Sequence, residues 1–305
     1  MKQRRGTLIV LPFVFIALLL LFPCRSAISG FSDVVGGVAD GVLPGKVGSA
    51  VKVAVALGKS FEDITPEQEY YIGRAVAANV LGKYPASLND RFDDYLNTLG
   101  QTLAQASDRP DTFGGYHFLL LDSPEINAFA APGGLILITR GMVRLCKTED
   151  ALAAVLAHEI GHIQGRHGLK AIKNSRLTDA FNVAATEAAR TYGPAQLSKL
   201  TEAFEGSITD ITSTLMTSGY SRDLEQDADK GAVTILRRVG YDPGALVVML
   251  TEMKKQLKPG GLDFAKTHPD PKDRIDYVKP LIGNAPAKPI PPERQHRFEA
   301  ATQNL

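Results

Sequence analysis

The stretch His158-Glu159-Ile160-Gly161-His162 follows a run of strong helix formers at residues 149–157, in a chain of 305 residues. On a helix, two histidines four positions apart project from the same face, about one turn from each other. Both imidazoles can therefore reach a single zinc ion at roughly 2.0–2.1 Å. The chain has only six histidines, so a chance match to HExxH has a probability on the order of one in a hundred or less. The stretch thus predicts a helix that carries a metal site.

Glu159 lies beside the predicted metal ion rather than on it. From there its carboxylate can take a proton from a water molecule that the metal polarises, since a bound zinc lowers the pKa of that water toward about 7. Gly161 in the middle of the helix costs about 1 kcal/mol relative to alanine. That cost is easier to understand if another backbone packs closely there. Glu159 is therefore the predicted general base.

A catalytic zinc site needs a third protein ligand besides the two histidines. The pattern HExxHxxGxxH would supply it locally, but Gly168 stands at the last position and His167 is one residue out of register. His167 is therefore expected to be a polar residue at the end of the helix. The third ligand must come from elsewhere in the chain.

The better candidate lies in the acidic stretch Ser221-Arg222-Asp223-Leu224-Glu225-Gln226-Asp227-Ala228-Asp229, at the start of another helical segment. Glu225 and Asp229 are four residues apart and share one helix face. One carboxylate can bind zinc while the other holds a ligand histidine through its remaining ring N–H. An acidic helix start is more often a solvated face that compensates the helix dipole. Together with an HExxH that lacks a third ligand, this stretch is the leading source of that ligand.

The segments around these motifs predict a mostly helical α+β fold. Residues 65–68, Thr-Pro-Glu-Gln, provide an N-cap, a proline at the first helical position and a glutamine three residues after the cap, so a helix should run toward Leu81. Apolar residues at helical spacing predict a second helix over residues 88–106. Short apolar runs at residues 116–121 and 135–139 predict strands of one small sheet beside the HExxH helix.

Helical patterning then continues from Glu149 to about Leu257, with breaks at Gly193-Pro194, Gly219 and residues 240–243. Beyond Gly283 the chain is rich in proline and is expected to be an extended tail over residues 284–305. Cys146 is expected to be a small buried hydrophobic residue.

The N-terminus has the pattern of a secretory signal at residues 1–29: a basic start, an apolar run at residues 8–22, then small residues where cleavage after Ser26 or Ser29 is expected. The apolar run, interrupted by Pro12, is short for a membrane-spanning helix. Cys24 could instead be acylated, but the bulky Phe22-Pro23 before it disfavours that processing. Residues 30–59 are rich in glycine, valine and alanine and are expected to be a loosely ordered lead-in.

Composition narrows the possible partners. The 34 basic and 33 acidic residues give a net charge of +1, which provides no electrostatic reason to expect a nucleic-acid partner. Two cysteines, one of them in the predicted signal, leave the mature chain without an internal disulfide.

The residues quoted above resemble the HtpX and CAAX prenyl protease type of zinc metallopeptidase, a gluzincin family marked by HExxH and a distant ExxxD. Three further segments look like family segments in family order: residues 67–74, 127–134 and 267–274. The resemblance covers roughly residues 60–281 and implies a zincin-like catalytic domain, expected over residues 60–283, with one Zn²⁺ per chain. By its ExxxD it implies Glu225 as the third zinc ligand and Asp229 as the carboxylate that holds a ligand histidine. It is greatest for the exported bacterial branch that works in quality control of envelope proteins, because no second apolar run of about 20 residues is present.

The resemblance gives possible roles to three more residues. Asn127 could offer its amide to the backbone of an extended substrate, and the competing role is a local turn cap. His268 and Arg274 could reach the oxygen that becomes negative in the tetrahedral transition state. Their competing role is a proline-flanked surface loop. A glycine-rich loop at residues 260–263 could cover the zinc until substrate displaces it.

The resulting hypothesis is an exported zinc metalloendopeptidase of the bacterial periplasm or the membrane surface, acting on unfolded or membrane-associated envelope proteins. Peripheral membrane association is compatible with it. The competing hypothesis is a zinc-stabilised chaperone or assembly factor with little proteolysis. The intact Glu159 separates the two, because a structural zinc site has no need of a base beside the metal.

Overall fold

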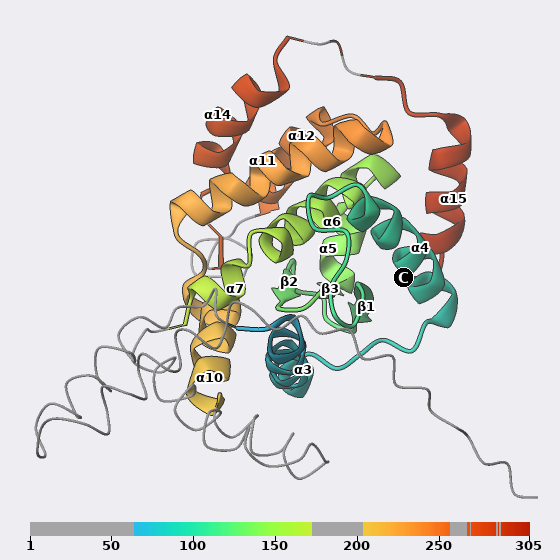
Figure 1. The fold of residues 1–305 in the computed structure, drawn as a ribbon. Coiled ribbons are helices and arrows are strands. Elements are labelled where there is room, and N and C mark those ends of the chain that lie inside the picture. Colours follow the sequence, from blue (N-terminus) through green and yellow to red (C-terminus); the bar gives the residue numbers. More distant parts are fainter. Residues whose placement is uncertain (1–63, 173–203, 257–266, 269, 285, 287) are drawn as a thin grey trace, which may run out of the picture. The chain divides into compact units, whose positions relative to one another are not determined.

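The helix α6 (Glu149–Gln164) carries the HExxH stretch and packs against elements from both sides of the sequence (Figure 1). The computed structural model describes residues 64–172, 204–256, 267–268, 270–284, 286 and 288–305, all of them within the unit Val55–Leu305. The predicted signal, the lead-in, the break at Gly193-Pro194 and the glycine loop at residues 260–263 lie outside the described residues. Within the described part, no helix is long and apolar enough to span a bilayer.

Helices α3 (Pro66–Lys83) and α4 (Asp90–Gln105) precede the sheet, and both were predicted within a few residues. At the start of α3, Thr65 Oγ1 accepts a hydrogen bond from the Gln68 amide, and Gln68 Oε1 accepts one from the Thr65 amide. This is the reciprocal cap that the sequence predicted. After the sheet come the remaining elements: α5 (Arg140–Leu145), α6, α7 (His167–Lys170), α10 (Glu205–Ser213), the π-helical turn η2 (Thr214–Ser218), α11 (Arg222–Val239), α12 (Gly244–Gln256), α14 (Pro271–Ile282) and α15 (Pro292–Thr302).

The sheet has three strands in the order β1–β3–β2. Strands β1 (His117–Leu121) and β3 (Leu135–Thr139) pair in parallel, and β2 (Ala128–Ala131) pairs antiparallel with β3. The two predicted strands are therefore confirmed, and β2 is an addition to them. Every residue of β2 is buried, because both faces of the sheet are covered.

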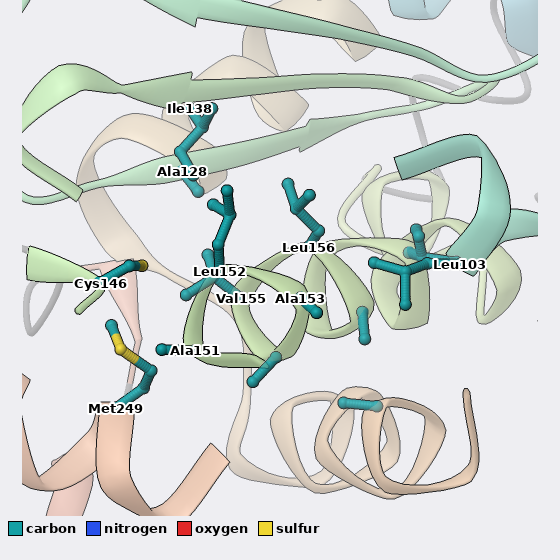
Figure 2. Packing of buried hydrophobic residues seen from close by; sticks show 14 of the residues in the cluster. Leu103, Ala128, Ile138, Cys146, Ala151, Leu152, Ala153, Val155, Leu156 and Met249 are labelled. Carbon is teal, nitrogen blue, oxygen red and sulfur yellow. The ribbon is translucent and has the colours of Figure 1, made fainter. Parts of the chain in front are cut away.

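The two faces of the sheet belong to two different hydrophobic clusters. Ile136 and Ile138 of β3 pack in the cluster that contains α4, α6 and α12, whereas Leu137 packs in the cluster of α3 and α10. In Figure 2, Leu152 and Leu156 of α6 point toward the sheet, near Ala128 and Ile138, and Met249 of α12 lies on the other side of α6. The HExxH helix is thus fixed from both sides by apolar packing. Cys146 is a buried member of this core, as predicted.

The expectation of an extended tail after Gly283 is wrong for residues 292–302, which form helix α15. Pro292 stands at the start of this helix, where its missing N–H costs nothing. Helix α15 contacts α4 and α6, and Arg297 forms an ion pair with the buried Glu149 at the N-terminus of α6. Proline content therefore marked the start of a docked helix rather than an extended segment.

Candidate metal centre

The close approach of α6 and α11 creates the site. A Cβ atom built on Gly161 would lie 2.7 Å from the backbone oxygen of Ala228 and 2.9 Å from its Cα. Only glycine lets the two backbones come this near, which confirms the close packing expected at Gly161. The crossing places Glu225 and Asp229 of α11 beside the two histidines of the HExxH stretch, and all four side chains are buried.

The three predicted ligands face one another through their donor atoms. His158 Nε2 lies 3.1 Å from His162 Nε2 and 3.5 Å from Glu225 Oε2. His162 Nε2 lies 3.5 Å from Glu225 Oε1. Two ligands bound tetrahedrally at 2.0–2.1 Å would be about 3.3 Å apart. The two imidazole nitrogens are therefore spaced like two ligands of one metal ion, and each lies at a similar distance from one oxygen of the same Glu225 carboxylate.

Two buried carboxylate oxygens at this point, Glu159 Oε1 and Glu225 Oε2, lack hydrogen-bond partners among the described residues. A buried carboxylate oxygen without a partner is costly and rare. A metal ion would occupy the coordination of Glu225, and a water molecule would suit Glu159. The chemistry of the donor set thus agrees with the spacing.

His268 joins the same group, although the sequence predicted it as a donor to the transition state rather than as a possible ligand. Its Nδ1 lies 2.8 Å from Glu225 Oε1. One ligand atom from each of His158, His162, Glu225 and His268 lies within 4.8 Å of the others. The structure therefore brings four potential metal ligands together.

Asp229 and Arg274 lie behind His158. Asp229 Oδ1 is 3.0 Å from His158 Nδ1, while Arg274 donates to both carboxylate oxygens of Asp229, at 2.6 Å from Nη2 and 3.0 Å from Nε. Carboxylates in this position commonly fix the orientation of a metal-binding imidazole. Arg274, predicted near the transition state, is engaged here in a two-pronged contact with Asp229.

Charges within the cluster shift the acidities of its members. Burial raises the pKa of Glu159, which suits a group that must accept a proton. Burial also disfavours charge on Glu225, but the imidazoles of His268 and His158 outweigh it and hold the pKa of Glu225 well below its ordinary value. For Asp229, burial is likewise outweighed, chiefly by Arg274, and its pKa is lowered. Glu225 and Asp229 are thus kept anionic, and Glu159 is the more basic carboxylate.

Asn127 lies at the start of β2, where its Oδ1 accepts a hydrogen bond from the Ala128 amide at 2.9 Å. Its backbone is tied to Thr139 of β3 by hydrogen bonds in both directions. These local hydrogen bonds are the kind expected if Asn127 caps a turn, which was the competing role. A contact of Asn127 with substrate stays a prediction.

Sequence reasoning missed two neighbours of His162. His167 begins α7 instead of ending α6, is fully buried, and places its Nδ1 2.9 Å from His162 Nδ1. Tyr220 stacks on the His162 ring, with ring centroids 4.4 Å apart. The only signal in the sequence was the adjacency of Gly165, Arg166 and His167 to the motif, and nothing in its periodicity indicated a reversal of the chain there.

Comparison with known proteins identifies the family. The model of peptidase family M48 matches residues 91–281, more than half of the chain. The β-barrel assembly-enhancing protease of Escherichia coli O157:H7 is 28% identical over 228 residues, which cover 70% of this chain and 45% of that protein. The mitochondrial metalloendopeptidase OMA1 of Schizosaccharomyces pombe is 26% identical over 77% of this chain and 67% of its own length.

A shorter match, 26% identical over 51% of this chain, is to the metalloprotease LoiP of Escherichia coli K12. The chain spans about half the length of the assembly-enhancing proteases that it matches. The extent of the family match, the names of these relatives and the cluster of two histidines, Glu225 and His268 all agree. The chain belongs to peptidase family M48, and the metalloendopeptidase class expected from its sequence is confirmed at the level of that family.

Proposed function

We propose that this protein is a zinc-dependent metalloendopeptidase in which His158, His162 and Glu225 hold the metal and Glu159 is the general base. The observation that carries the proposal is the state of Glu159. Its Oε1 is buried and has no hydrogen-bond partner among the described residues, and its carboxyl group interacts electrostatically with His158, His268 and Glu225 of the cluster. A carboxylate held in this way is ready to accept a proton from a water molecule at the site.

Zinc, when bound, would supply a Lewis acid that acidifies a coordinated water and polarises the peptide carbonyl. The donor set of two histidines and one carboxylate is typical of catalytic zinc in proteases. Glu159 takes the proton from the attacking water and passes it to the departing amine. Asp229 holds the ring of His158 through Nδ1, and Arg274 in turn holds Asp229.

His268 has two roles open to it. As a donor it would stabilise the negative oxygen of the transition state. As a fourth ligand beside Glu225 it would occupy the position that the water needs. Replacement by alanine separates these roles, since it lowers kcat if His268 is a donor and raises the rate of cutting if His268 competes with water.

For substrate and location, we propose unfolded or membrane-associated proteins of the bacterial envelope, with the enzyme exported to the periplasm or bound at a membrane surface. The N-terminal sequence supports export, and the printed name of several relatives links them to β-barrel assembly. Cell fractionation tests the proposal. A cytosolic protein that keeps residues 1–29 would contradict it.

The zinc itself is tested by metal analysis and by chelation. We expect one zinc per chain, cutting of casein that stops on treatment with a chelator, and recovery on addition of zinc. A purified protein with no metal that still cuts casein would contradict the proposal. A protein that binds zinc and prevents aggregation, yet cuts nothing, would support the chaperone alternative.

A further inference from the structure

The two predicted zinc-binding histidines are supported in different ways. The second nitrogen of His158 faces a carboxylate directly, Asp229, at 3.0 Å. The second nitrogen of His162 faces another imidazole, His167, at 2.9 Å between the two Nδ1 atoms. On its far side, His167 Nε2 lies 3.1 Å from Asp227 Oδ2. We propose that Asp227 and His167 form a relay that positions His162 for metal binding, and this rests on the proposed function only in taking His162 as a ligand.

The hydrogen bonds of this relay can be satisfied in one consistent way. If His162 binds the metal through Nε2, which faces His158 and Glu225, its proton is on Nδ1. His162 Nδ1–H then donates to His167 Nδ1, which must be an acceptor. The proton of neutral His167 is therefore on Nε2, where it donates to the carboxylate of Asp227. Each ring is neutral and each contact has one donor. The chain of hydrogen bonds from His162 through His167 to Asp227 therefore fixes the proton of His162 on Nδ1.

The local backbone is shaped to deliver His167 to this position. Arg166 adopts a left-handed conformation, with φ of 52° and ψ of 35°, which is unusual for a residue other than glycine. Its guanidinium holds the turn by donating to the Ile64 carbonyl at 2.8 Å and by pairing with the buried Glu69 at 3.3 Å. The turn ends α6 and directs His167 back toward His162. A strained residue held by its surroundings is common at functional sites.

Gly165 makes room for the ring. A Cβ atom built there would lie 2.1 Å from His167 Nε2 and 2.6 Å from its Cδ2. Gly165 has a φ of −76°, which any residue can adopt, so the glycine is required by the imidazole and not by the backbone. Tyr220 covers one face of the His162 ring. The His162 ring is therefore confined by stacking on its face and by His167 at its edge.

Helix α11 supplies three carboxylates around the two histidines, at alternate positions of its sequence. Glu225 faces the metal position, Asp229 holds His158, and Asp227 reaches His162 through His167. Asp227 is half exposed, whereas the other two are buried. The carboxylate that acts on His162 through His167 is thus accessible to solvent, whereas the carboxylate that contacts His158 is not.

The test measures zinc affinity by competition with a chromophoric chelator, which reads the centre without depending on hydrolysis. His167→Phe keeps an aromatic ring at this position and removes both hydrogen-bonding nitrogens, so zinc affinity should fall by about 10–100-fold, the range found for partners of metal-binding histidines. His167→Asn keeps an acceptor oxygen at the place of Nδ1 and should recover part of that loss. Asp227→Asn should lose less than His167→Phe, because its amide oxygen can still accept from His167.

Asp223→Asn, an exposed change on the same helix, is the matched control and should bind zinc like the wild type. Circular dichroism on each variant establishes that it is folded. Wild-type affinity in folded His167→Phe, or equal losses in His167→Phe and His167→Asn, would overturn the relay. A wild-type protein that binds zinc but cuts no protein would overturn the proposed function alone, since the affinity comparison still applies.

Discussion

Glu149 and Glu159 lie ten residues apart on the same helix, are both almost fully buried, and have opposite hydrogen-bonding states. Each oxygen of Glu149 accepts from a tyrosine hydroxyl, Tyr95 at 3.0 Å and Tyr241 at 2.6 Å, and both oxygens also accept from Arg297. Oε1 of Glu159 has no hydrogen-bond partner among the described residues. Since burial is the same, burial alone does not mark a functional carboxylate. What distinguishes Glu159 is an oxygen that accepts no hydrogen bond from any described residue.

The same contrast separates the two ends of α6. At the N-terminal end, Asp150 accepts from Arg294 at 3.1 Å and from the Asp242 amide at 3.2 Å, so its cluster ties α15 and the start of α12 to the helix. At the other end, His158 and His162 face Glu225. Its Oε2 has no hydrogen-bond partner among the described residues, although His158 Nε2 lies 3.5 Å and Arg274 Nη1 3.6 Å away. A satisfied polar cluster fixes an architecture. A polar cluster in which some oxygens lack hydrogen-bond partners is suited to bind an ion and a substrate.

The largest effect is expected when one buried glutamate is replaced at the metal end, and it is compared with a replacement at the N-terminal end of α6. Glu225→Ala should lose the zinc and with it all measurable cutting, because it removes the one carboxylate of the proposed ligand set and leaves the two histidines of the HExxH stretch. Glu149→Gln, the matched change at the other end, should keep one zinc per chain and lose thermal stability instead. Metal analysis and calorimetry on both variants check this. Full zinc occupancy in Glu225→Ala would remove Glu225 from the ligand set.

An intermediate effect is expected at Asp229. Asp229→Asn removes the charge that holds His158 and that Arg274 neutralises, so zinc affinity should fall by about 10–100-fold while the fold persists. Chelator competition measures the change, and Asp223→Asn on the exposed side of α11 is its control. An unchanged affinity would mean that Asp229 serves only the packing of Arg274.

The smallest effect is expected at Arg297. Arg297→Ala leaves Glu149 buried with its two tyrosine donors, so the free energy of unfolding should fall by about 1–3 kcal/mol, toward the lower end because Arg297 is half exposed. Zinc affinity should not change. Denaturant unfolding compares this variant with Arg144→Ala, an exposed arginine of α5. Equal stability of the two variants would show that the contact of Arg297 with Glu149 adds nothing to the stability of the fold.

Sequence patterns predicted the elements that carry their own local signals. The start of α3 followed from Thr65, Pro66 and Gln68, and α4 followed from apolar spacing. The breaks at Gly219 and Gly240 are real, and both glycines have positive φ. Strand β2 was missed because its residues, Ala-Phe-Ala-Ala, are buried on both faces and show no alternation. Helix α15 was missed because its stability depends on contacts with α4 and α6.

At the site, spacing predicted that His158 and His162 share a face, and the family resemblance selected Glu225 and Asp229 from a distant segment. The position of His268 within the ligand group could not be read from the sequence, since it depends on how α14 and the preceding residues pack on α11. The contact of His167 with His162 depends on the left-handed turn at Arg166. Contacts created by such a reversal leave no periodic pattern.

The central claim is that the carboxylate of Glu159, with one oxygen free of hydrogen bonds from the described residues, accepts a proton during peptide hydrolysis. Glu159→Gln tests it most directly. The change keeps the size of the side chain and leaves His158, His162 and Glu225 to hold the metal. The account predicts normal folding, one zinc per chain, and a fall in kcat/KM on casein of about 10²–10⁴-fold. Equal cutting by the wild type and a zinc-loaded Glu159→Gln protein would contradict it.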